Sequence, residues 1–323
     1  MAEPPAIRTM GLTKHYGDTK ALNDLDLEVE QGEIFGFLGP NGAGKTTTIR
    51  AVLNYITPTS GSAEVLGMDA ATQSVELRRH ISYQPAEYSM YPNLTGGQYL
   101  QYFANLRGGV DNAYVHALAE RLGADLTKKI SDYSTGNKQK IGLIQAFMSK
   151  PRVLLLDEPA TGLDPLVQTE LQAMYREAQD EGRTVFLSSH TLGEVERVAG
   201  RVAILRLGHL VVVERVDDLK RKAIRRLDIE FEHDVAASVF DGVSGVRSVD
   251  ARGTHVSVSF DGPVGDLLRV VVNHSVLNIH SRDADLEEIF LTYYRNDQAN
   301  DHAGGNRAQE GDPTGGGARF HAR

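Results

Sequence analysis

The chain has 323 residues, of which 41% are hydrophobic, a formal net charge of −9 and no cysteine. This size allows one large core and a smaller second one, while the lack of cysteine excludes disulfides and thiolate metal sites. The acidic balance gives no support for general nucleic-acid binding. No apolar run approaches the roughly 18 residues of a membrane-spanning helix, and the start, Met-Ala-Glu-Pro-Pro, predicts no secretory signal.

The first informative segment reads Gly-Pro-Asn-Gly-Ala-Gly-Lys-Thr over residues 39–46 and matches the phosphate-binding pattern GxxxxGK[ST]. An apolar run at 33–38 predicts a buried strand before it, and residues 46–54 favour a helix after it. The glycines allow backbone N–H groups to converge on phosphate oxygens at the helix start. Lys45 would reach the β and γ phosphates, and the Thr46 hydroxyl would bind Mg²⁺. The expected ATP-binding residues are Gly39, Pro40, Asn41, Gly42, Ala43, Gly44, Lys45, Thr46 and Thr47.

A mostly helical insert is expected next, at about residues 84–150, with helical stretches at 74–79 and 96–123. Aromatic and soft apolar side chains gather in this insert. Those at 88–91 (Tyr88, Met90, Tyr91) favour a protein interface. Tyr99, Tyr102 and Phe103 recur at helical spacing, which favours the core over the interface.

Two further strand ends carry polar groups. Residues 153–156 are apolar and lead directly into Asp157 and Glu158, as a central parallel strand ends at its ligand-binding edge. Asp157 fits a Mg²⁺ shell, and Glu158 could polarise a water aimed at the γ-phosphate. Residues 184–187 form another apolar run that ends at His190, which is either structural or a γ-phosphate ligand. Between the insert and these strands, Ser134 and Gly136 open a helix and form either a simple N-cap or a second anion site.

The order of these segments resembles the nucleotide-binding subunit of ATP-binding-cassette (ABC) transporters over about residues 6–215. The family signature LSGGQ corresponds to residues 133–137, the Walker B acids to Asp157 and Glu158, and the D-loop to 161–165, with Asp164 near the nucleotide. His190 looks like the switch histidine. Tyr16 matches the aromatic that stacks on adenine, although a half-buried strand-end tyrosine is the alternative.

This resemblance implies a head-to-tail pair of identical chains, in which Ser134 and Gly136 of each contact the γ-phosphate held by the other. ATP would hold the pair closed, and hydrolysis would release it, with both sites active. It also implies a separate polytopic membrane subunit, attachment to the cytoplasmic face of the membrane, and no nucleic-acid partner. The expected activity is ATP hydrolysis that drives export, and the family's drug- and antibiotic-export members share the small C-terminal domain described below.

Two positions depart from the family pattern. Thr135 and Asn137 replace the usual glycine and glutamine of the signature, which puts a β-branched residue where the backbone is normally unencumbered. In the Q-loop, Ala86 stands where the metal-contacting glutamine is expected, and Gln84 comes two residues early. Either Gln84 binds the metal through a changed loop, or Glu87 or water takes that role.

The fold expected is α/β: a P-loop ABC cassette over residues 1–220, with a mixed sheet core, an antiparallel β arm and the helical insert. A basic run at 220–226 is interpreted as a solvated helix face. Residues 221–295 predict a small α+β domain in the β-α-β-β-α-β order of ferredoxin-like folds, ending in a helix at 285–291. Residues 296–323 are glycine-rich and polar, and predict a disordered tail.

Two other functional classes compete with export. A soluble ABC ATPase in translation or DNA repair is the main alternative, but such proteins usually carry two cassettes or long coiled coils, and this chain has one cassette and a short insert without sustained heptads. A small-molecule kinase would share the phosphate loop but would have no use for a signature helix or for Glu158. Export is favoured over both.

Overall fold

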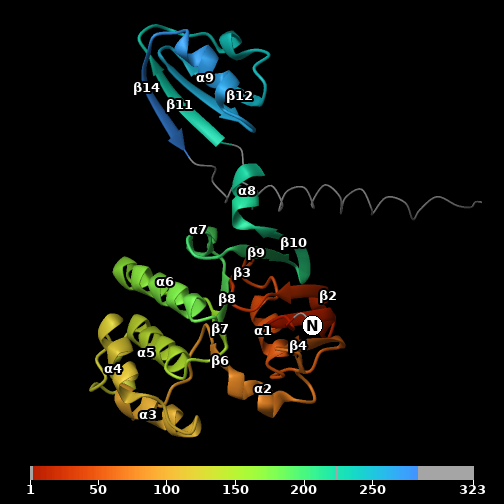
Figure 1. The fold of residues 1–323 in the computed structure, drawn as a ribbon, viewed down its shortest axis with the longest axis vertical. Coiled ribbons are helices and arrows are strands. Elements are labelled where there is room, and N and C mark those ends of the chain that lie inside the picture. The colour runs from red at the N-terminus through yellow and green to blue at the C-terminus, as the bar shows by residue number, and fades with distance from the viewer. Residues whose placement is uncertain (1–2, 223–224, 283–323) are drawn as a thin grey trace, which may run out of the picture.

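A computed structural model describes residues 3–222 and 225–282 (Figure 1). Its centre is a six-stranded sheet in the order β10-β9-β3-β8-β7-β6. All neighbours are parallel except the edge strand β10, which pairs antiparallel with β9. The strands are β3 (Ile34–Leu38), β6 (Ile81–Gln84), β7 (Val153–Asp157), β8 (Thr184–Ser189), β9 (Arg201–Arg206) and β10 (His209–Arg215). Every residue of β3, β7 and β8 is buried, as expected for parallel strands covered on both faces.

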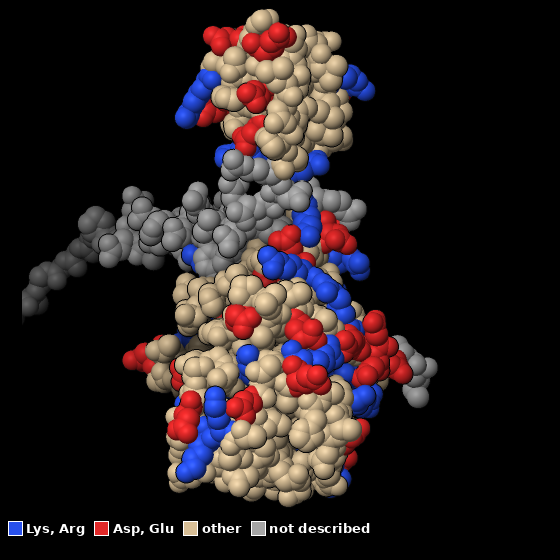
Figure 2. Space-filling model, turned by 90° about the vertical axis from the view of Figure 1, so that its left-hand side faces the viewer, with Lys and Arg blue, Asp and Glu red and all other residues tan. Residues whose placement is uncertain are grey.

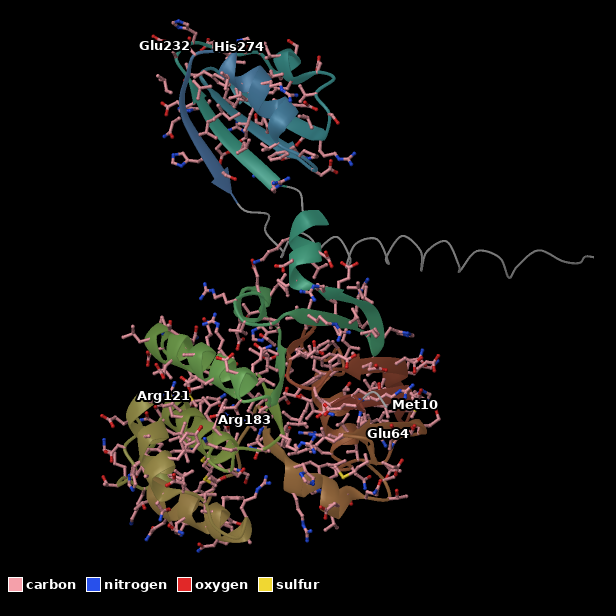
Figure 3. The ribbon with its side chains drawn as sticks, in the orientation of Figure 1. Met10, Glu64, Arg121, Arg183, Glu232 and His274 are labelled. Carbon is pink, nitrogen blue, oxygen red and sulfur yellow. The ribbon has the colours of Figure 1, made fainter. Side chains whose placement is uncertain are left out.

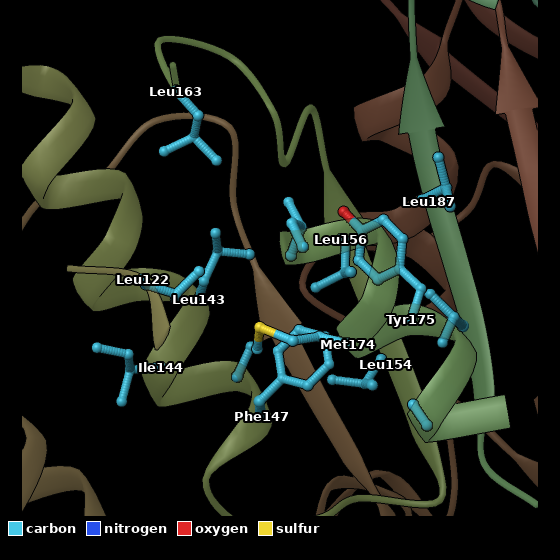
Figure 4. Packing of buried hydrophobic residues seen from close by; sticks show 14 of the residues in the cluster. Leu122, Leu143, Ile144, Phe147, Leu154, Leu156, Leu163, Met174, Tyr175 and Leu187 are labelled. Atoms are coloured by element: carbon cyan, nitrogen blue, oxygen red, sulfur yellow. The ribbon is translucent and has the colours of Figure 1, made fainter. Parts of the chain in front are cut away.

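The two faces of this sheet bury different cores. One face packs with α1 (Lys45–Val52) and a second, antiparallel sheet in the order β2-β1-β4-β5. The other face packs against α5 (Thr135–Phe147) and α6 (Pro165–Asp180), and Figure 4 shows this core around Leu154, Leu156 and Leu187. The second sheet contains β1 (Ile7–Tyr16), β2 (Thr19–Val29), β4 (Ser60–Val65) and β5 (Met68–Asp69). Both the mixed sheet and the antiparallel arm were expected, and both are confirmed.

The helical insert differs from its prediction in one place. The sequence predicts helix from 96 to 123, but the structure divides this stretch into α3 (Gly96–Leu106) and α4 (Asn112–Arg121). Gly108 and Gly109 have φ of 81° and 106°, outside the helical range, and Asp111 caps α4 by accepting the Ala113 N–H at 2.9 Å. The remaining helices of the cassette are α2 (Ser74–His80), the 3₁₀ turn Ile130–Asp132, α7 (Leu192–Glu196) and α8 (Val216–Lys222).

The aromatic side chains of the insert divide between core and surface. Tyr99 is buried in the core, as predicted, whereas Tyr102 is 44% exposed, so the core interpretation is wrong for Tyr102. Tyr91 is exposed, as an interface residue would be. The Tyr88 hydroxyl, by contrast, is buried against Gly142 of α5, where the absence of a side chain makes room for the phenol ring.

Residues 225–282 form a separate four-stranded antiparallel sheet in the order β12-β13-β11-β14. This order, with α9 and a 3₁₀ turn on one face, is the ferredoxin-like arrangement that the sequence predicts. Its elements are β11 (Arg225–Phe231), the turn Ala237–Phe240, β12 (Val246–Arg252), β13 (His255–Phe260), α9 (Gly265–Val272) and β14 (Val276–Arg282). The predicted helix at 285–291 and the predicted tail at 296–323 lie outside the described residues.

Neither sign of charge dominates the face of the molecule that Figure 2 shows. On the face shown in Figure 2, acidic and basic side chains are interspersed over the cassette. Within the described ranges, no helix is both long and apolar enough to cross a membrane.

Candidate active site

The glycine-rich loop joins β3 to α1 and depends on its glycines. Gly44 has φ of 111° and immediately precedes α1, and a Cβ there would lie 2.5 Å from the Ala21 carbonyl oxygen. A Cβ on Gly39 would lie 2.5 Å from the Leu205 carbonyl oxygen. Only glycine therefore fits either position. The loop delivers the first, unpaired N–H groups of α1 to one spot, which is a favourable site for an anion such as a phosphate.

Lys45 is the cation of this loop. Its side chain is only 6% exposed, and its ammonium donates to the Gly39 carbonyl at 2.5 Å and lies 3.2 Å from Glu158 Oε1. Ala43 is buried beside it, Pro40 and Asn41 are exposed, and Thr47 is half-buried on α1. The buried Lys45 ammonium is held by carbonyl oxygens and one carboxylate. It can exchange these partners for phosphate oxygens, which carry more negative charge.

Thr46 and Asp157 meet at the end of β7. The Thr46 hydroxyl donates to Asp157 Oδ2 at 2.7 Å, and the Ser188 hydroxyl donates to Asp157 Oδ1 at 2.5 Å. Asp157 is fully buried. Hydroxyl and carboxylate oxygens are the ligands that Mg²⁺ prefers, so this donor set fits a magnesium ion that also contacts phosphate. Ser188 was missed from sequence, although it pairs with Asp157 in the strand register.

The Glu158 carboxylate lies between the Lys45 ammonium and the His190 imidazole. Its Oε2 lies 2.7 Å from His190 Nδ1, and its Oε1 faces Lys45. The Glu158 backbone has φ of 51°, a conformation that costs energy for a residue with a side chain. His190 is half-exposed, so the carboxylate sits where buried residues meet solvent. This arrangement can orient and polarise a water molecule.

Gln84 lies on the wrong face for the metal role that the sequence suggests. It pairs with Leu156 in the parallel register, and Leu156 faces the core of α5 and α6. Asp157, one residue on, points to the opposite face, toward Thr46. Gln84 is fully buried, and its amide has no hydrogen-bond partner among the described residues. Its neighbour Tyr83 shares the Asp157 face, where burial and the Asp157 charge raise the tyrosine pKa to about 12.

The signature segment contacts the D-loop of the same chain. Ser134 is exposed and caps α5 by accepting the Asn137 N–H at 3.3 Å, which is the N-cap role left open from sequence. A Cβ on Gly136 would lie 2.6 Å from the Gly162 carbonyl oxygen, so this glycine permits close contact. Thr135 is the first residue of α5 and has no positive φ, so its branched side chain causes no backbone strain.

Tyr16 and Asp164 occupy element ends. Tyr16 is the last residue of β1 and is half-exposed, with the Lys14 ammonium 5.0 Å from its ring centre. Such a ring is open to stacking. Asp164 caps α6, accepting the N–H groups of Leu166 and Val167 at 3.1 and 3.0 Å. The one sequence feature that indicates this capping role is the position of Asp164 directly before Pro165.

Two residues near Glu158 were not found from sequence. Gln139 of α5 is buried and donates to the carbonyl oxygens of Glu158 and Pro159, at 3.2 and 2.8 Å. Glu194 of α7 bonds Ser189, the residue before His190. Gln139 follows the signature by two residues and Glu194 follows His190 by four. Neither lies within a recognised motif, and their burial and partners became visible only in the structure.

The comparisons agree with this geometry. A model of the ABC transporter family matches residues 22–161. The bacitracin transport ATP-binding protein BcrA of Enterococcus faecalis is 33% identical over 291 residues, which cover 88% of this chain and 94% of that protein. BcrA of Bacillus licheniformis is 36% identical, with 88% and 96% covered. A solved ATP-binding subunit of an ABC transporter aligns with 67% of this chain and 92% of its own at 29% identity, with a TM-score of 0.61.

Proposed function

The chain belongs to the ABC transporter family, and we propose that it is the ATP-hydrolysing subunit of an exporter whose pore is a separate membrane subunit. The observation that carries the catalytic part is the Glu158 carboxylate, which lies 3.2 Å from the Lys45 ammonium and 2.7 Å from His190 Nδ1. Nothing comparable supports the alternative role in translation or DNA repair.

The site residues have distinct roles in hydrolysis. Backbone N–H groups at the start of α1 and the Lys45 ammonium bind and orient the phosphates, and Tyr16 stacks on adenine. Lys45 exchanges its contact with Glu158 for phosphate oxygens, which frees the carboxylate to accept a proton from the attacking water. His190 holds that carboxylate and donates toward the γ-phosphate. Thr46 and Asp157 would hold Mg²⁺, which neutralises phosphate charge when bound.

A second copy of the chain completes each site in this proposal. The exposed Ser134 and the N-terminus of α5 turn an anion-binding helix end to solvent, away from the core. Head-to-tail pairing brings Ser134 and Gly136 of one chain to the γ-phosphate bound by the other. ATP then links the two chains, and its hydrolysis removes the link. Because both copies carry Glu158 and His190, both sites are active.

The cassette has a groove on which the membrane subunit would dock. A cavity of about 660 Å³ lies between the β6 edge and the helical insert, and its walls include exposed Tyr55, Val75 and Leu106. Apolar walls with a few arginines suit an amphipathic helix from a partner. We place the chain on the cytoplasmic face of the membrane through this contact. The named relatives transport bacitracin, which makes a peptide antibiotic or a drug the proposed cargo.

Co-purification from gently solubilised membranes tests this proposal. The tagged chain should bring down a polytopic membrane protein in stoichiometric amount. Leu106→Asp places a charge in the groove and should abolish that association, while Val272→Asp, equally exposed but on α9, should not. Recovery of ribosomal components or nucleic acid in place of a membrane protein would contradict the export role and leave the ATPase assignment intact.

A further inference from the structure

A ring of hydrogen bonds encloses the turn that carries His190. The Ser189 hydroxyl oxygen accepts the Thr191 N–H at 3.0 Å and lies 3.2 Å from the Thr191 carbonyl oxygen. The same hydroxyl lies 2.8 Å from Glu194 Oε2, on the short helix α7 that follows. His190 is the only residue between Ser189 and Thr191, so these bonds determine where its imidazole points.

The number of protons indicates which form of Glu194 completes the ring. Ser189 has one hydroxyl proton, so it cannot donate to both Glu194 and the Thr191 carbonyl. With an ionised Glu194, Ser189 donates to the carboxylate and the carbonyl contact is lost. With a neutral Glu194, the carboxylic O–H donates to Ser189 and the Ser189 proton goes to the carbonyl. Only the neutral acid allows all three contacts of the Ser189 hydroxyl to be hydrogen bonds.

The second carboxyl oxygen of Glu194 lies in buried surroundings near Tyr175. Glu194 Oε1 and the Tyr175 hydroxyl are both buried, and within the described part of the chain neither has a hydrogen-bond partner. Tyr175 lies in the α6 core beside Leu156 and Leu187 (Figure 4), and its pKa is raised well above its usual value by burial and next by the Glu194 charge. Burial of this oxygen opposes a negative charge on Glu194.

The charges around Glu194 act in the same direction. Burial raises its pKa above the usual value, and the Glu158 carboxylate raises it further. Ser189, His190 and the Ala160 backbone N–H oppose this shift without reversing it. ATP brings more negative charge to the same place, which favours the neutral form again.

We propose that Glu194, as a neutral acid, is a positioning residue for hydrolysis: it donates to Ser189, fixes the turn at residues 189–191, and so holds His190 against Glu158. It acts on the reaction only through Ser189 and the turn that carries His190. Because it also faces the Ala160 backbone, it ties the segment after Glu158 to the His190 turn.

Steady-state ATPase measurements on the full chain test this role. Glu194→Gln keeps a donor at the same place and should retain most of the wild-type kcat. Glu194→Ala should lower kcat by about 10- to 100-fold, with little change in KM for ATP, because a misplaced catalytic group costs this much. Ser189→Ala should give a similar loss, and the two losses should not add in the double variant. The control is Glu196→Gln, which removes the same charge from α7 together with its 3.0 Å contact with Lys220.

The pH profile separates this role from a purely structural one. Wild-type kcat should fall on the alkaline side as Glu194 ionises, and Glu194→Gln should lack that component. If Glu194→Gln is as impaired as Glu194→Ala, an ionised carboxylate is needed and the proposal is wrong. Wild-type activity in Glu194→Ala would equally overturn it. If thermal melting shows that Glu194→Ala is unfolded, full activity of Ser189→Ala would overturn the proposal.

Discussion

At the scale of single residues, the Tyr88 ring fills the space that a side chain on Gly142 would need. A methyl group on Gly142 would overlap the Tyr88 phenol. We expect Gly142→Ala to lower the free energy of unfolding by about 1–3 kcal/mol, since the ring has to leave its place. In the Tyr88→Leu background the same substitution should cost clearly less, because the shorter side chain leaves room. Denaturant titration of the four proteins measures this coupling, and equal costs in both backgrounds would show that the ring does not occupy that space.

The loop Gly39–Thr46 could be placed in the site from sequence, whereas the position of the Gln84 side chain could not. The phosphate loop and the pair Asp157 and Glu158 are local patterns, so their positions followed from spacing alone. The face on which Gln84 lies depends on its pairing with Leu156, 72 residues away in sequence, and that pairing is not written in either segment. The burial of the Tyr88 hydroxyl was missed for the same reason, since the glycine that admits the ring lies on another element.

At the scale of elements, an arginine ties the helical insert to the core. Arg121 at the end of α4 donates to Glu177 Oε1 and Oε2 of α6 at 2.7 Å each, and to Glu170 at 2.5 Å; Figure 3 labels Arg121. The hydrogen bonds from Arg121 hold the Glu177 pKa below its usual value of 4.5. Such a lowered pKa adds stability above pH 4.5 that disappears as the pH falls through the folded-state value.

Glu177→Gln should therefore lower stability at neutral pH by about 0.5–1 kcal/mol, a modest amount because Glu177 is half-exposed. The difference from wild type should shrink in acid, where wild-type Glu177 is protonated as well. Glu120→Gln, on the exposed side of α4, is the matched control. Unfolding curves at neutral and acidic pH measure both, and a deficit that persists unchanged in acid would rule out the ion pair as its source.

Most elements were predictable because their signals are local, and the exceptions have identifiable causes. Apolar runs identified β3, which lies between glycines, and β7 and β8, which end in polar groups, and alternation identified β11 and β13. The break between α3 and α4 was missed because the apolar positions on both sides keep a helical period, which outweighed Gly108 and Gly109. The link from Arg121 to Glu177 spans 56 residues and required the packed helices to be seen.

At the scale of the whole molecule, the proposed active site is divided between two surfaces. The phosphate loop, Asp157 and Glu158 meet at one edge of the central sheet, while Ser134 lies exposed at the start of α5. A single chain would then bind ATP without completing the γ-phosphate site, and closure of a pair would be the step that couples binding to transport. The central claim is that ATP joins two copies through Ser134 and that Glu158 drives their separation.

The most direct test is the mass in solution of the Glu158→Gln chain, measured by size-exclusion chromatography with light scattering. Without Glu158 the nucleotide persists, so Mg²⁺ and ATP should convert the monomer to a dimer, and ADP should not. Adding Ser134→Arg should abolish this dimer, whereas Ser131→Arg, at an exposed serine one turn earlier, should leave it intact. A Glu158→Gln chain that stays monomeric at saturating ATP, or a dimer indifferent to Ser134→Arg, would contradict the account.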